Sequence, residues 1–499
     1  MRGYPPALSD ARVAEQCPSC ASFRLEYEFR NVFGRISRCA DCTLLFRDDV
    51  EPPAVVAQVD YSARVADRLE HLCSSIGCSP SNVLAVLPPG AAFPAGRTDV
   101  IAADQLLAHG SPNPPYDAIV CVDAIDRVAD PAALLAAIHA ALAPGASASF
   151  SVASVSSSAA RYAGGSWSGF RTAATTFFGV DTLQSTLVRA GFRDPKFYTD
   201  GRIRPGSIRV RSIAWFLTTF GLRPAAMRLQ RSAGLLDESM TAVATRGEAI
   251  LRHRLSVIVP IYNERATFRV LMDRLIAKEI EGVDIQIILV ESNSTDGSRD
   301  DVLAYAAHPR VTVVLQDRPA GKGNAVRAGL ARATGDIVMF QDADLEYEID
   351  DYDDLVKPIR AYQRNFVIGS RHSRKGSAWK IRDFNDAPLL SQVFNFGHVV
   401  FLGLLNGIYG QSLDDPFSMF KVFRRDCLAG LAFECDRFDF DFEIVIKLLR
   451  KGYRPTEIPV NYHSRSIAEG KKVTMLRDPL TWLAALARFR TSRLYPHDS

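Results

Sequence analysis

Residues 335–346 read GDIVMFQDADLE, and the fold prediction starts from them. The apolar run 337–340 is typical of a strand covered on both faces, and it leads directly into Asp342, Asp344 and Glu346. Side chains two positions apart leave the same face of an extended chain, so the three carboxylates should converge and repel unless a cation lies between them. Their hard oxygen atoms suit Mg²⁺ or Mn²⁺. The alternative is an acidic surface loop, because an Asp-x-Asp pair alone is common.

Length and composition predict a globular protein of two or three domains. A chain of 499 residues exceeds one typical domain, and 47% hydrophobic with 23% charged residues is ordinary for a soluble protein. A net charge of +3 is too small to indicate nucleic-acid binding. The first residues lack the apolar core of a secretory signal, and the apolar stretch 398–409 is too short to span a bilayer. We therefore expect a cytoplasmic protein, either free or peripheral at the inner face of the membrane.

Four of the nine cysteines form two C-x-x-C pairs, separated by residues 21–38. This spacing fits a zinc ribbon with four thiolate ligands, and residues 23–29 between the pairs alternate as a strand does. Such a site is structural, because no coordination position is left for water. The alternative is two chance pairs of free thiols. The predicted zinc ligands are Cys17, Cys20, Cys39 and Cys42.

Residues 80–200 alternate between expected strands (83–87, 116–122 and 148–155) and a helix at 131–142 that Pro144 and Gly145 end. This region resembles the class I S-adenosylmethionine-dependent methyltransferases, in the group that begins with a cysteine-rich zinc ribbon. The resemblance implies a Rossmann-like fold. It is carried by YDAIVCVDAIDRVADPAALLAAIHAALAPG (116–145), GGSWSGF (164–170) and TLQSTLVRAGF (182–192).

The resemblance fails where that family binds its cofactor. The family has a glycine-rich turn after its first strand, whereas Pro88 and Pro89 follow the strand here and remove backbone donors. Asp126 and Arg127 replace the usual Glu-His, and the spacing between the strands is short. We expect a degenerate domain that does not bind S-adenosylmethionine. An active methyltransferase is the alternative.

Two stretches of the chain combine basic and apolar side chains, and each can be interpreted in two ways. Residues 201–254 look like a helical connector whose arginines are interleaved with apolar side chains. The end of the chain, from Leu480 to Phe489, is similarly amphipathic. Each stretch either lies on an anionic membrane or packs its apolar side on a neighbouring part of the protein.

From residue 255 the chain alternates between strong strands and helices. Expected strands are 255–260, 285–290, 311–315 and 337–340, and expected helices are 267–277, 300–307 and one that ends near residue 333. This βαβ order predicts a parallel sheet with helices on both faces, and ligands bind at the carboxyl ends of such strands.

The segment 255–490 resembles family 2 glycosyltransferases with a GT-A fold, near the dolichyl-phosphate and polyprenyl-phosphate sugar synthases. Its motifs follow the family's order across roughly half of the chain. They are VPIYNE (259–264), ESNSTDGS (291–298), GKGNAV (321–326), QDADLEY (341–347), GSRH (369–372), DDPFSMFKVFRR (414–425), RFDFDFE (437–443) and RSIAEGKK (465–472).

The resemblance implies a role for each motif in binding a nucleotide-sugar donor. Tyr262 would flank the base and Glu291 would accept a hydrogen bond from it. Lys322 would approach the phosphates, and Arg371 would hold a phosphate. A metal bound by Asp342, Asp344 and Glu346 would bridge the diphosphate, with Arg465 and Lys471 on a loop that closes over it. The donor site so implied is completed by Pro260, Glu264, Ser292 and Ala343, and Ser292 stands where many members have Asp.

The acceptor side has two candidate catalytic acids, Asp441 and Asp415. Asp441 aligns with the base of relatives that use a hydroxyl acceptor. A hydroxyl must lose its proton during attack, whereas a polyprenyl phosphate is already anionic. The alternative is that the acids at 439, 441, 414 and 415 begin helices. A Gln-x-x-Arg-Trp segment is absent, which disfavours a processive polysaccharide synthase.

Together these observations predict a metal-dependent, inverting glycosyltransferase of cell-envelope glycan synthesis that uses a polyprenyl phosphate or similar acceptor. The alternatives are a hydroxyl acceptor on a glycan or small molecule, or a bifunctional methyltransferase and glycosyltransferase. The predicted segments are a zinc ribbon (1–50), a methyltransferase-like domain (51–200), a connector (201–254) and a GT-A domain (255–499).

Overall fold

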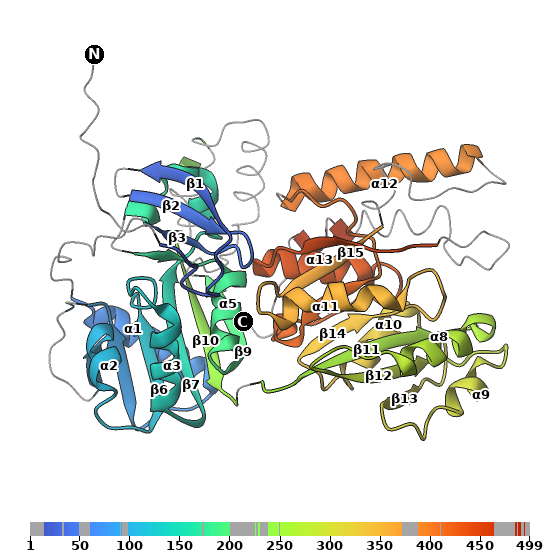
Figure 1. Cartoon of the computed structure of the whole chain (residues 1–499), viewed down its shortest axis with the longest axis horizontal. Coiled ribbons are helices and arrows are strands. Elements are labelled where there is room, and N and C mark those ends of the chain that lie inside the picture. Colours follow the sequence, from blue (N-terminus) through green and yellow to red (C-terminus); the bar gives the residue numbers. More distant parts are fainter. Residues whose placement is uncertain are drawn as a thin grey trace, which may run out of the picture. The chain divides into compact units, whose positions relative to one another are not determined.

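The structure is a computed structural model that divides the chain into two compact units, Met1–Ala249 and Ile250–Ser499 (Figure 1). It describes residues 14–31, 34–48, 60–89, 91, 98–171, 174–199, 225, 228–229, 238–248, 250–371, 388–409, 411–463, 485–486, 488–490 and 494. Both units contain helices and a largely parallel sheet, so the predicted α/β class is confirmed.

The main sheet of the N-terminal unit has the strand order β5-β4-β6-β7-β10-β9. The first four strands are parallel, and β10 runs antiparallel to both β7 and β9. Residues 239–246, within the predicted helical connector, thus form a central strand. The strands are β4 (Val83–Leu87), β5 (Asp99–Ala102), β6 (Tyr116–Val122), β7 (Leu142–Ala153), β9 (Phe192–Thr199) and β10 (Ser239–Arg246).

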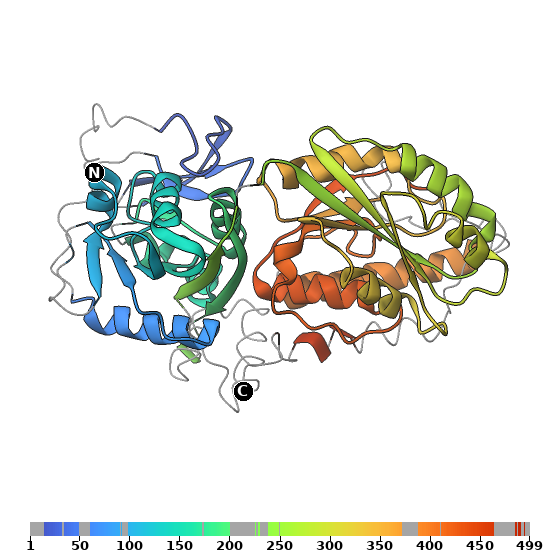
Figure 2. The ribbon, with the colours of Figure 1, turned by 90° about the horizontal axis from the view of Figure 1, so that it is seen from below.

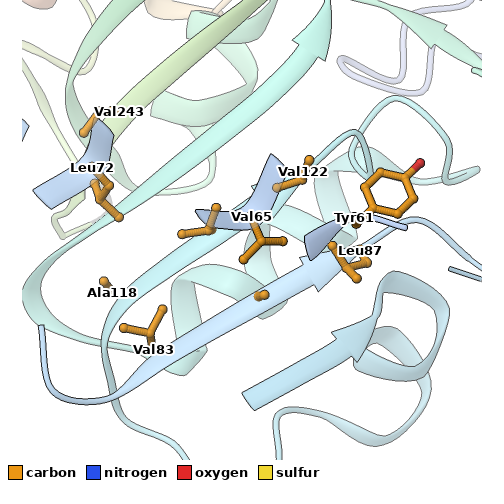
Figure 3. Close-up of a cluster of buried hydrophobic side chains, with 10 residues drawn as sticks. Tyr61, Val65, Leu72, Val83, Leu87, Ala118, Val122 and Val243 are labelled. Carbon is orange, nitrogen blue, oxygen red and sulfur yellow. The ribbon is translucent and has the colours of Figure 1, made fainter. Parts of the chain in front are cut away.

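Helix α1 (Ser62–Ile76) shows how this sheet is covered. Its Val65 and Leu72, seven positions apart, lie on one helical face and pack on side chains of β4 and β6 (Figure 3). The other helices of the unit are α2 (Ala103–His109), α3 (Pro131–Ala141), α4 (Ser158–Ala163) and α5 (Val180–Arg189), with short helices η1 (Gly164–Ser166) and η2 (Ser168–Arg171).

The sequence predicted that Pro144 and Gly145 end helix α3, and this prediction was wrong. The helix ends at Ala141, and both residues lie inside strand β7. Strand β7 pairs with β6 at Leu142 and again from Ser147 onward, and Pro144 lies between these pairs. Its missing N–H therefore removes no hydrogen bond between the two strands.

A second sheet, β1-β2-β3-β8, carries the cysteine pairs. Its strand β8 comes from the methyltransferase-like segment, and Phe177 of β8 pairs with Leu45 of β3. Ile36 shares an apolar cluster with Trp167 and Phe170. The ribbon therefore shares a core with residues far along the chain. Its strands are β1 (Leu25–Asn31), β2 (Gly34–Cys39), β3 (Leu45–Arg47) and β8 (Thr176–Phe177).

The C-terminal unit is built on a seven-stranded sheet of order β13-β12-β11-β14-β16-β15-β17. Strands β13, β12, β11 and β14 are parallel, and β16 runs antiparallel to β14 and β15. The predicted bounds of β13 and β14 are confirmed. The strands are β11 (His253–Ile261), β12 (Val283–Glu291), β13 (Val311–Leu315), β14 (Ile337–Phe340), β15 (Phe366–Ser370), β16 (Lys421–Arg424) and β17 (Thr456–Pro459).

Helices cover both faces of this sheet (Figure 2). They are α8 (Arg265–Ala277), α9 (Ser298–Leu303), α10 (Lys322–Leu330), α11 (Tyr352–Arg360), α12 (Pro388–Tyr409) and α13 (Phe440–Lys451), with short helices η3 (Ile349–Asp351) and η4 (Arg425–Leu428). Within the part of the chain that the structure describes, none of the helices combines the length and apolar character that crossing a bilayer requires.

Register places the carboxyl ends of three strands at one edge of the sheet. Ile261 of β11 pairs with Glu291 of β12, and Ile258 of β11 pairs with Phe340 of β14. The segments that follow these strands, which carry most of the predicted donor-site residues, therefore emerge together.

Candidate functional site

The turns after β11 and β12 are locked to each other by hydrogen bonds. Asn263 and Asn293 both have left-handed backbones, with φ of 53° and 58°, a conformation that asparagine tolerates. The Asn263 N–H donates to Ser294 Oγ at 3.0 Å, and Asn263 Oδ1 accepts from the Thr295 N–H at 2.8 Å. The bracing holds Tyr262 at the edge of the sheet with 38% of its surface exposed, a position that suits the predicted contact with a base.

Glu291 and Ser292 serve the turn in which they lie. The fully buried Glu291 carboxylate accepts the N–H groups of Asn293 (3.2 Å) and Ser294 (2.6 Å). The Ser292 hydroxyl donates to Gln316 Oε1 at 2.8 Å. A hydrogen bond from Glu291 to a base stays a prediction beside this structural role.

Pro260 and Glu264 frame the same edge. Pro260 is half-buried within β11. Glu264 precedes α8 as its N-cap residue, and its N–H donates to Ser298 Oγ at 3.0 Å. Both residues lie within two positions of Tyr262 in the sequence, and their contact with a donor stays a prediction.

The ammonium group of Lys322 lies among carboxylates at this edge. Its Nζ is 2.8 Å from Asp342 Oδ1, 3.1 Å from Asp342 Oδ2 and 3.9 Å from Asp441 Oδ2. Burial acts to lower the pKa of Lys322, but Asp342, Asp441 and, less strongly, Asp344 raise it above its ordinary value. The lysine is therefore charged, and three acids from two elements share one cationic group.

Among the described residues, Asp342, Asp344 and Glu346 do not form a group whose carboxylate oxygens all lie within 4.8 Å of one another, and their binding of a metal stays a prediction. Strand β14 ends at Phe340, and Asp344 and Glu346 lie on a bend rather than in the strand. Glu346 accepts a hydrogen bond from the Tyr462 hydroxyl at 3.0 Å instead. Ala343, between the aspartates, is buried, and its carbonyl accepts from Thr267 Oγ1 at 2.9 Å. The bend is therefore braced against α8.

Two of these acids nevertheless fit a divalent ion. Asp342 already pairs with a cationic group, the Lys322 ammonium, at 2.8 Å, and Asp344 lies two residues further along the same segment. Mg²⁺ is commonly held by one or two carboxylates together with substrate phosphates. Asp342 and Asp344 therefore suit such an ion, whereas the Glu346 carboxylate accepts a hydrogen bond from Tyr462.

Glycines let the lysine turn pack closely on the segment before α13. A Cβ on Gly321, whose φ is +99°, would lie 2.3 Å from the Asp436 carbonyl oxygen, and one on Gly323 would lie 2.6 Å from the Cys435 carbonyl oxygen. The buried Glu443 carboxylate fixes that segment by accepting the Cys435 N–H at 2.8 Å. The position of Lys322 therefore depends on close backbone packing.

Lys421, which sequence reasoning missed, completes the charge pattern. This lysine is fully buried in β16, and its Nζ is 4.0 Å from Asp441 Oδ1. Burial lowers the pKa of Lys421, and Asp441 opposes that shift. The sequence feature that could have identified Lys421 is its position at the start of the apolar strand segment KVF. Asp441 lies in the first turn of α13 and also faces both lysines, so the dipole and base interpretations remain compatible.

Arg371 and Asp415 form a buried bidentate pair. Arg371 donates from Nε and Nη2 to the two Asp415 carboxylate oxygens at 2.7 Å each. The backbone N–H of Arg371 also donates to Asp415 Oδ2, at 3.0 Å. Burial acts to lower the pKa of Arg371, and Asp415 raises it well above its ordinary value. Asp414 and Asp415 do not begin a helix. Because both of its oxygens bind Arg371, Asp415 positions that arginine rather than presenting a free base.

Glu457 binds the backbone of the segment that carries Asp415. Its carboxylate accepts the N–H groups of Asp414 and Asp415 at 2.7 and 2.5 Å. Burial raises the pKa of Glu457 to about 6.

The remaining predicted donor-loop residues, Arg465 and Lys471, lie outside the described residues. At the amphipathic end of the chain, Leu486 and Phe489 are buried, and Arg488 pairs with Glu434. For these residues the packing interpretation is confirmed. A cavity of about 500 Å³ lies at the amino ends of β11 and β12 and contains none of the predicted site residues.

The four predicted zinc ligands gather in the N-terminal unit. Their sulfur atoms all lie within 4.8 Å of one another, with Cys17 and Cys42 at 3.5 Å and Cys20 and Cys39 at 3.5 Å. Hydrogen bonding within the cluster lowers the pKa of Cys20 and Cys39 and raises that of Cys17 and Cys42. Among the described residues, this is the only such group of three or more His, Cys, Asp or Glu side chains.

Comparison with protein families identifies the two units. Residues 256–429 match the family described as glycosyl transferase family 2, and residues 46–194 match a methyltransferase domain family. The C-terminal unit therefore contains a family 2 glycosyltransferase domain, and the N-terminal unit contains a methyltransferase domain. Both predicted resemblances are confirmed.

Characterised relatives match this chain over less than half of its length. An undecaprenyl-phosphate 4-deoxy-4-formamido-L-arabinose transferase of Enterobacter sp. is 29% identical over 230 residues, which cover 46% of this chain and 64% of the relative. A dolichol-phosphate mannosyltransferase of Pyrococcus furiosus is 26% identical over 218 residues, covering 44% and 59%. The chain thus spans about three-fifths of the length of each relative.

Solved structures also resemble this chain. Glucosyl-3-phosphoglycerate synthase from Mycobacterium tuberculosis, in complex with Mn²⁺, uridine diphosphate and phosphoglyceric acid, is 20% identical, with 48% of this chain and 79% of that chain covered and a TM-score of 0.35. A mannosyltransferase from Pyrobaculum calidifontis, in complex with GDP-Man and Mn²⁺, is 24% identical, covering 42% and 55% with a TM-score of 0.29.

Proposed function

We propose that the protein is a metal-dependent, inverting glycosyltransferase that moves a sugar from a nucleotide-sugar donor to a polyprenyl phosphate or similar membrane-borne acceptor. The observation that carries the proposal is that one ammonium group, Lys322 Nζ, lies 2.8 Å from Asp342 and 3.9 Å from Asp441 where parallel strands end. Such edges bind ligands in open α/β sheets, and the family match supplies the reaction class.

The donor side combines base and diphosphate binding. Tyr262 would flank the base, and Asp342 with Asp344 would hold Mg²⁺ or Mn²⁺. When bound, the ion would offset the charge that develops on the departing nucleotide. Lys322, fixed in its glycine turn, adds a point charge beside the same position.

Three observations support an acceptor at a membrane. The relatives named above act on undecaprenyl and dolichol phosphates, and Arg371 offers a guanidinium oriented by Asp415 for a phosphate. Helix α12 packs Phe401 against Phe417 and Phe442, with ring centroids at 5.2 and 4.8 Å. The same helix exposes the apolar side chains of Val399, Val400 and Leu404 by 43–45%, and such side chains suit an acyl boundary.

The first test is a thermal-shift screen of nucleoside diphosphates with Mn²⁺, followed by transfer assays with the sugar of the stabilising nucleotide. Polyprenyl phosphate in anionic vesicles should accept the sugar. Val400→Glu should weaken vesicle association several-fold, whereas Val270→Glu, which charges an exposed valine on α8, should leave it unchanged. Transfer only to soluble hydroxyl acceptors would contradict the membrane-borne acceptor.

A hydroxyl acceptor is the second candidate, and the placement of Asp441 3.9 Å from Lys322, the lysine that pairs with Asp342, favours it. Asp441→Asn separates the two reactions. A loss of turnover of about 10²–10⁴-fold would indicate general-base catalysis on a hydroxyl, while little change would indicate a phosphate acceptor that needs no base.

We further propose that the methyltransferase domain does not bind S-adenosylmethionine. At the carboxyl end of β6, Asp123 pairs with Arg64 from the start of α1 and lies 3.8 Å from Arg127. This ion network lies at the strand edge where a cofactor would bind. Calorimetry of the full chain with S-adenosylmethionine tests the alternative of a bifunctional enzyme, and saturable binding would support that alternative.

A further inference from the structure

Lys322 has a contact that the proposed metal site does not require. Both oxygens of Asp342 lie within 3.1 Å of its Nζ, and its side chain is only 16% exposed. The glycine turn and its packing on residues 435–436 fix the backbone that carries the lysine. The ammonium group is therefore a resident partner of Asp342.

A divalent ion and this ammonium group compete for the same oxygens. Two cations a few ångströms apart repel strongly in a partly buried site, so an ion bound by Asp342 must displace Lys322. Asp441, 3.9 Å from Nζ on the other side, offers the displaced ammonium a second carboxylate.

We propose that Lys322 acts as an internal counter-cation that occupies the donor metal site of the free enzyme and changes partner from Asp342 to Asp441 when the metal binds. The inference rests on the proposed function only in taking Asp342 as a metal ligand. Lys322 thereby makes the metal ion bind weakly in the absence of nucleotide. The metal and the nucleotide are therefore expected to bind together.

Formal charge explains why the donor would restore metal affinity. Three carboxylates (Asp342, Asp344, Asp441) and two ammonium groups (Lys322, Lys421) give the free site a net charge of −1. A divalent ion alone would make the site positive, whereas a nucleoside diphosphate brings negative oxygens that bind the ion and offset both lysines. Metal and nucleotide should therefore bind cooperatively.

The test measures Mn²⁺ binding to zinc-replete full-length protein by the EPR signal of free Mn²⁺, without nucleotide. Lys322→Met should raise Mn²⁺ affinity at least about tenfold, which corresponds to about 1.4 kcal/mol. Lys278→Met is the matched control, because Lys278 pairs with Asp353 and is similarly covered, with 13% exposure. It should leave Mn²⁺ affinity unchanged. Adding Asp342→Asn to Lys322→Met should abolish the gain.

Adding a nucleoside diphosphate separates the two proposals. Wild type should gain Mn²⁺ affinity with nucleotide by a larger factor than Lys322→Met does. Unchanged or weaker nucleotide-free affinity in Lys322→Met, with normal binding in the presence of nucleotide, would overturn the counter-cation inference alone. Absence of Mn²⁺ binding in both proteins even with each nucleoside diphosphate would overturn the proposed metal site itself.

A measurement on wild-type protein avoids dependence on the folding of a variant. Acetylation of lysines, followed by mass spectrometry, reports how accessible each ammonium group is. Saturating Mn²⁺ should change the labelling rate of Lys322 and leave that of Lys278 constant. An unchanged rate for Lys322 at an Mn²⁺ concentration that fills the site would contradict the change of partner.

Discussion

The cysteine cluster and the carboxylate site are two candidate metal centres assembled in opposite ways. In the ribbon, two turns of the same design present the thiols: Ala21 and Thr43, each after the second cysteine of its pair, have left-handed backbones. Their N–H groups donate to the Cys17 and Cys39 carbonyls at 2.9 Å each. In the glycosyltransferase domain, Asp342 faces a lysine and Glu346 faces a tyrosine.

The difference reflects what each site needs from the fold. A structural site is complete when the chain folds, because all of its ligands belong to the protein. A site that binds a metal with a diphosphate needs only part of its ligands from the protein and must stay soluble and folded without the substrate. Lysines that neutralise the acids meet that need, since like charges left unpaired would repel.

The largest expected effect tests the closed site. Cys39→Ser should abolish binding of one Zn²⁺ per chain and destabilise the N-terminal unit, because metal binding to such ligand sets contributes on the order of 10 kcal/mol to folding. Metal content by mass spectrometry and thermal unfolding of the chain measure both effects. Cys78→Ser removes an exposed thiol outside the cluster and should change neither. Full zinc content in Cys39→Ser would show that the cluster is not the zinc site.

The fold was predictable wherever local pattern alone decides the structure. The bounds of β4, β6, β13 and β14 were predicted to the residue, because each is an apolar run between turn residues. Strand β10 was missed, since SMTAVATR is a mixed stretch beside a basic segment, and pairing with β7 and β9 decides its conformation.

The candidate site was predictable as a set of residues but not as a set of contacts. Family resemblance selected Arg371 and Asp415 separately, yet their pairing across 44 positions depends on tertiary structure. The prediction of three converging acids assumed extended backbone past Phe340, whereas the strand ends there and the chain bends from residue 343. The effect of Lys322 on Asp342 arises from close packing of a glycine turn, which spacing does not reveal.

The second prediction tests whether pairing, rather than metal, holds the acceptor side together. Asp415→Asn removes the charge that compensates the buried Arg371, so unfolding free energy of the C-terminal unit should fall by about 3 kcal/mol or more. Urea unfolding measures the change. Asp284→Asn disrupts the exposed pair with Arg252 and should have little effect. Equal losses in the two variants would contradict a special role for the buried pair.

The third prediction tests the open site through catalysis. Asp344→Ala should lower the transfer rate by about 10²–10³-fold, the size expected when a group that stabilises developing charge is lost. Thermal unfolding of the same variant measures the separate loss of the hydrogen bond from the Glu346 N–H to the buried Asp344 carboxylate, at 3.1 Å. Asp350→Ala, which removes an exposed acid a few residues further on, is the control. Full activity of Asp344→Ala in a steady-state assay would break the contrast between a closed structural site and an open catalytic one.

The smallest expected effect concerns Glu457. Burial raises the pKa of this residue from 4.5 to about 6. Below pH 4.5 the carboxyl is protonated in both states. Between pH 4.5 and 6 the unfolded chain loses this proton first, so the stability contribution falls as pH rises, by about 2 kcal/mol in total. Glu457→Gln removes this dependence, so its stability relative to wild type should increase by that amount between pH 4 and pH 7. Urea unfolding at both values measures the change. A relative stability independent of pH would mean that burial does not raise the pKa of Glu457, so that the carboxylate behind Asp415 would stay charged across this range and bind the Asp414 and Asp415 N–H groups at both pH values.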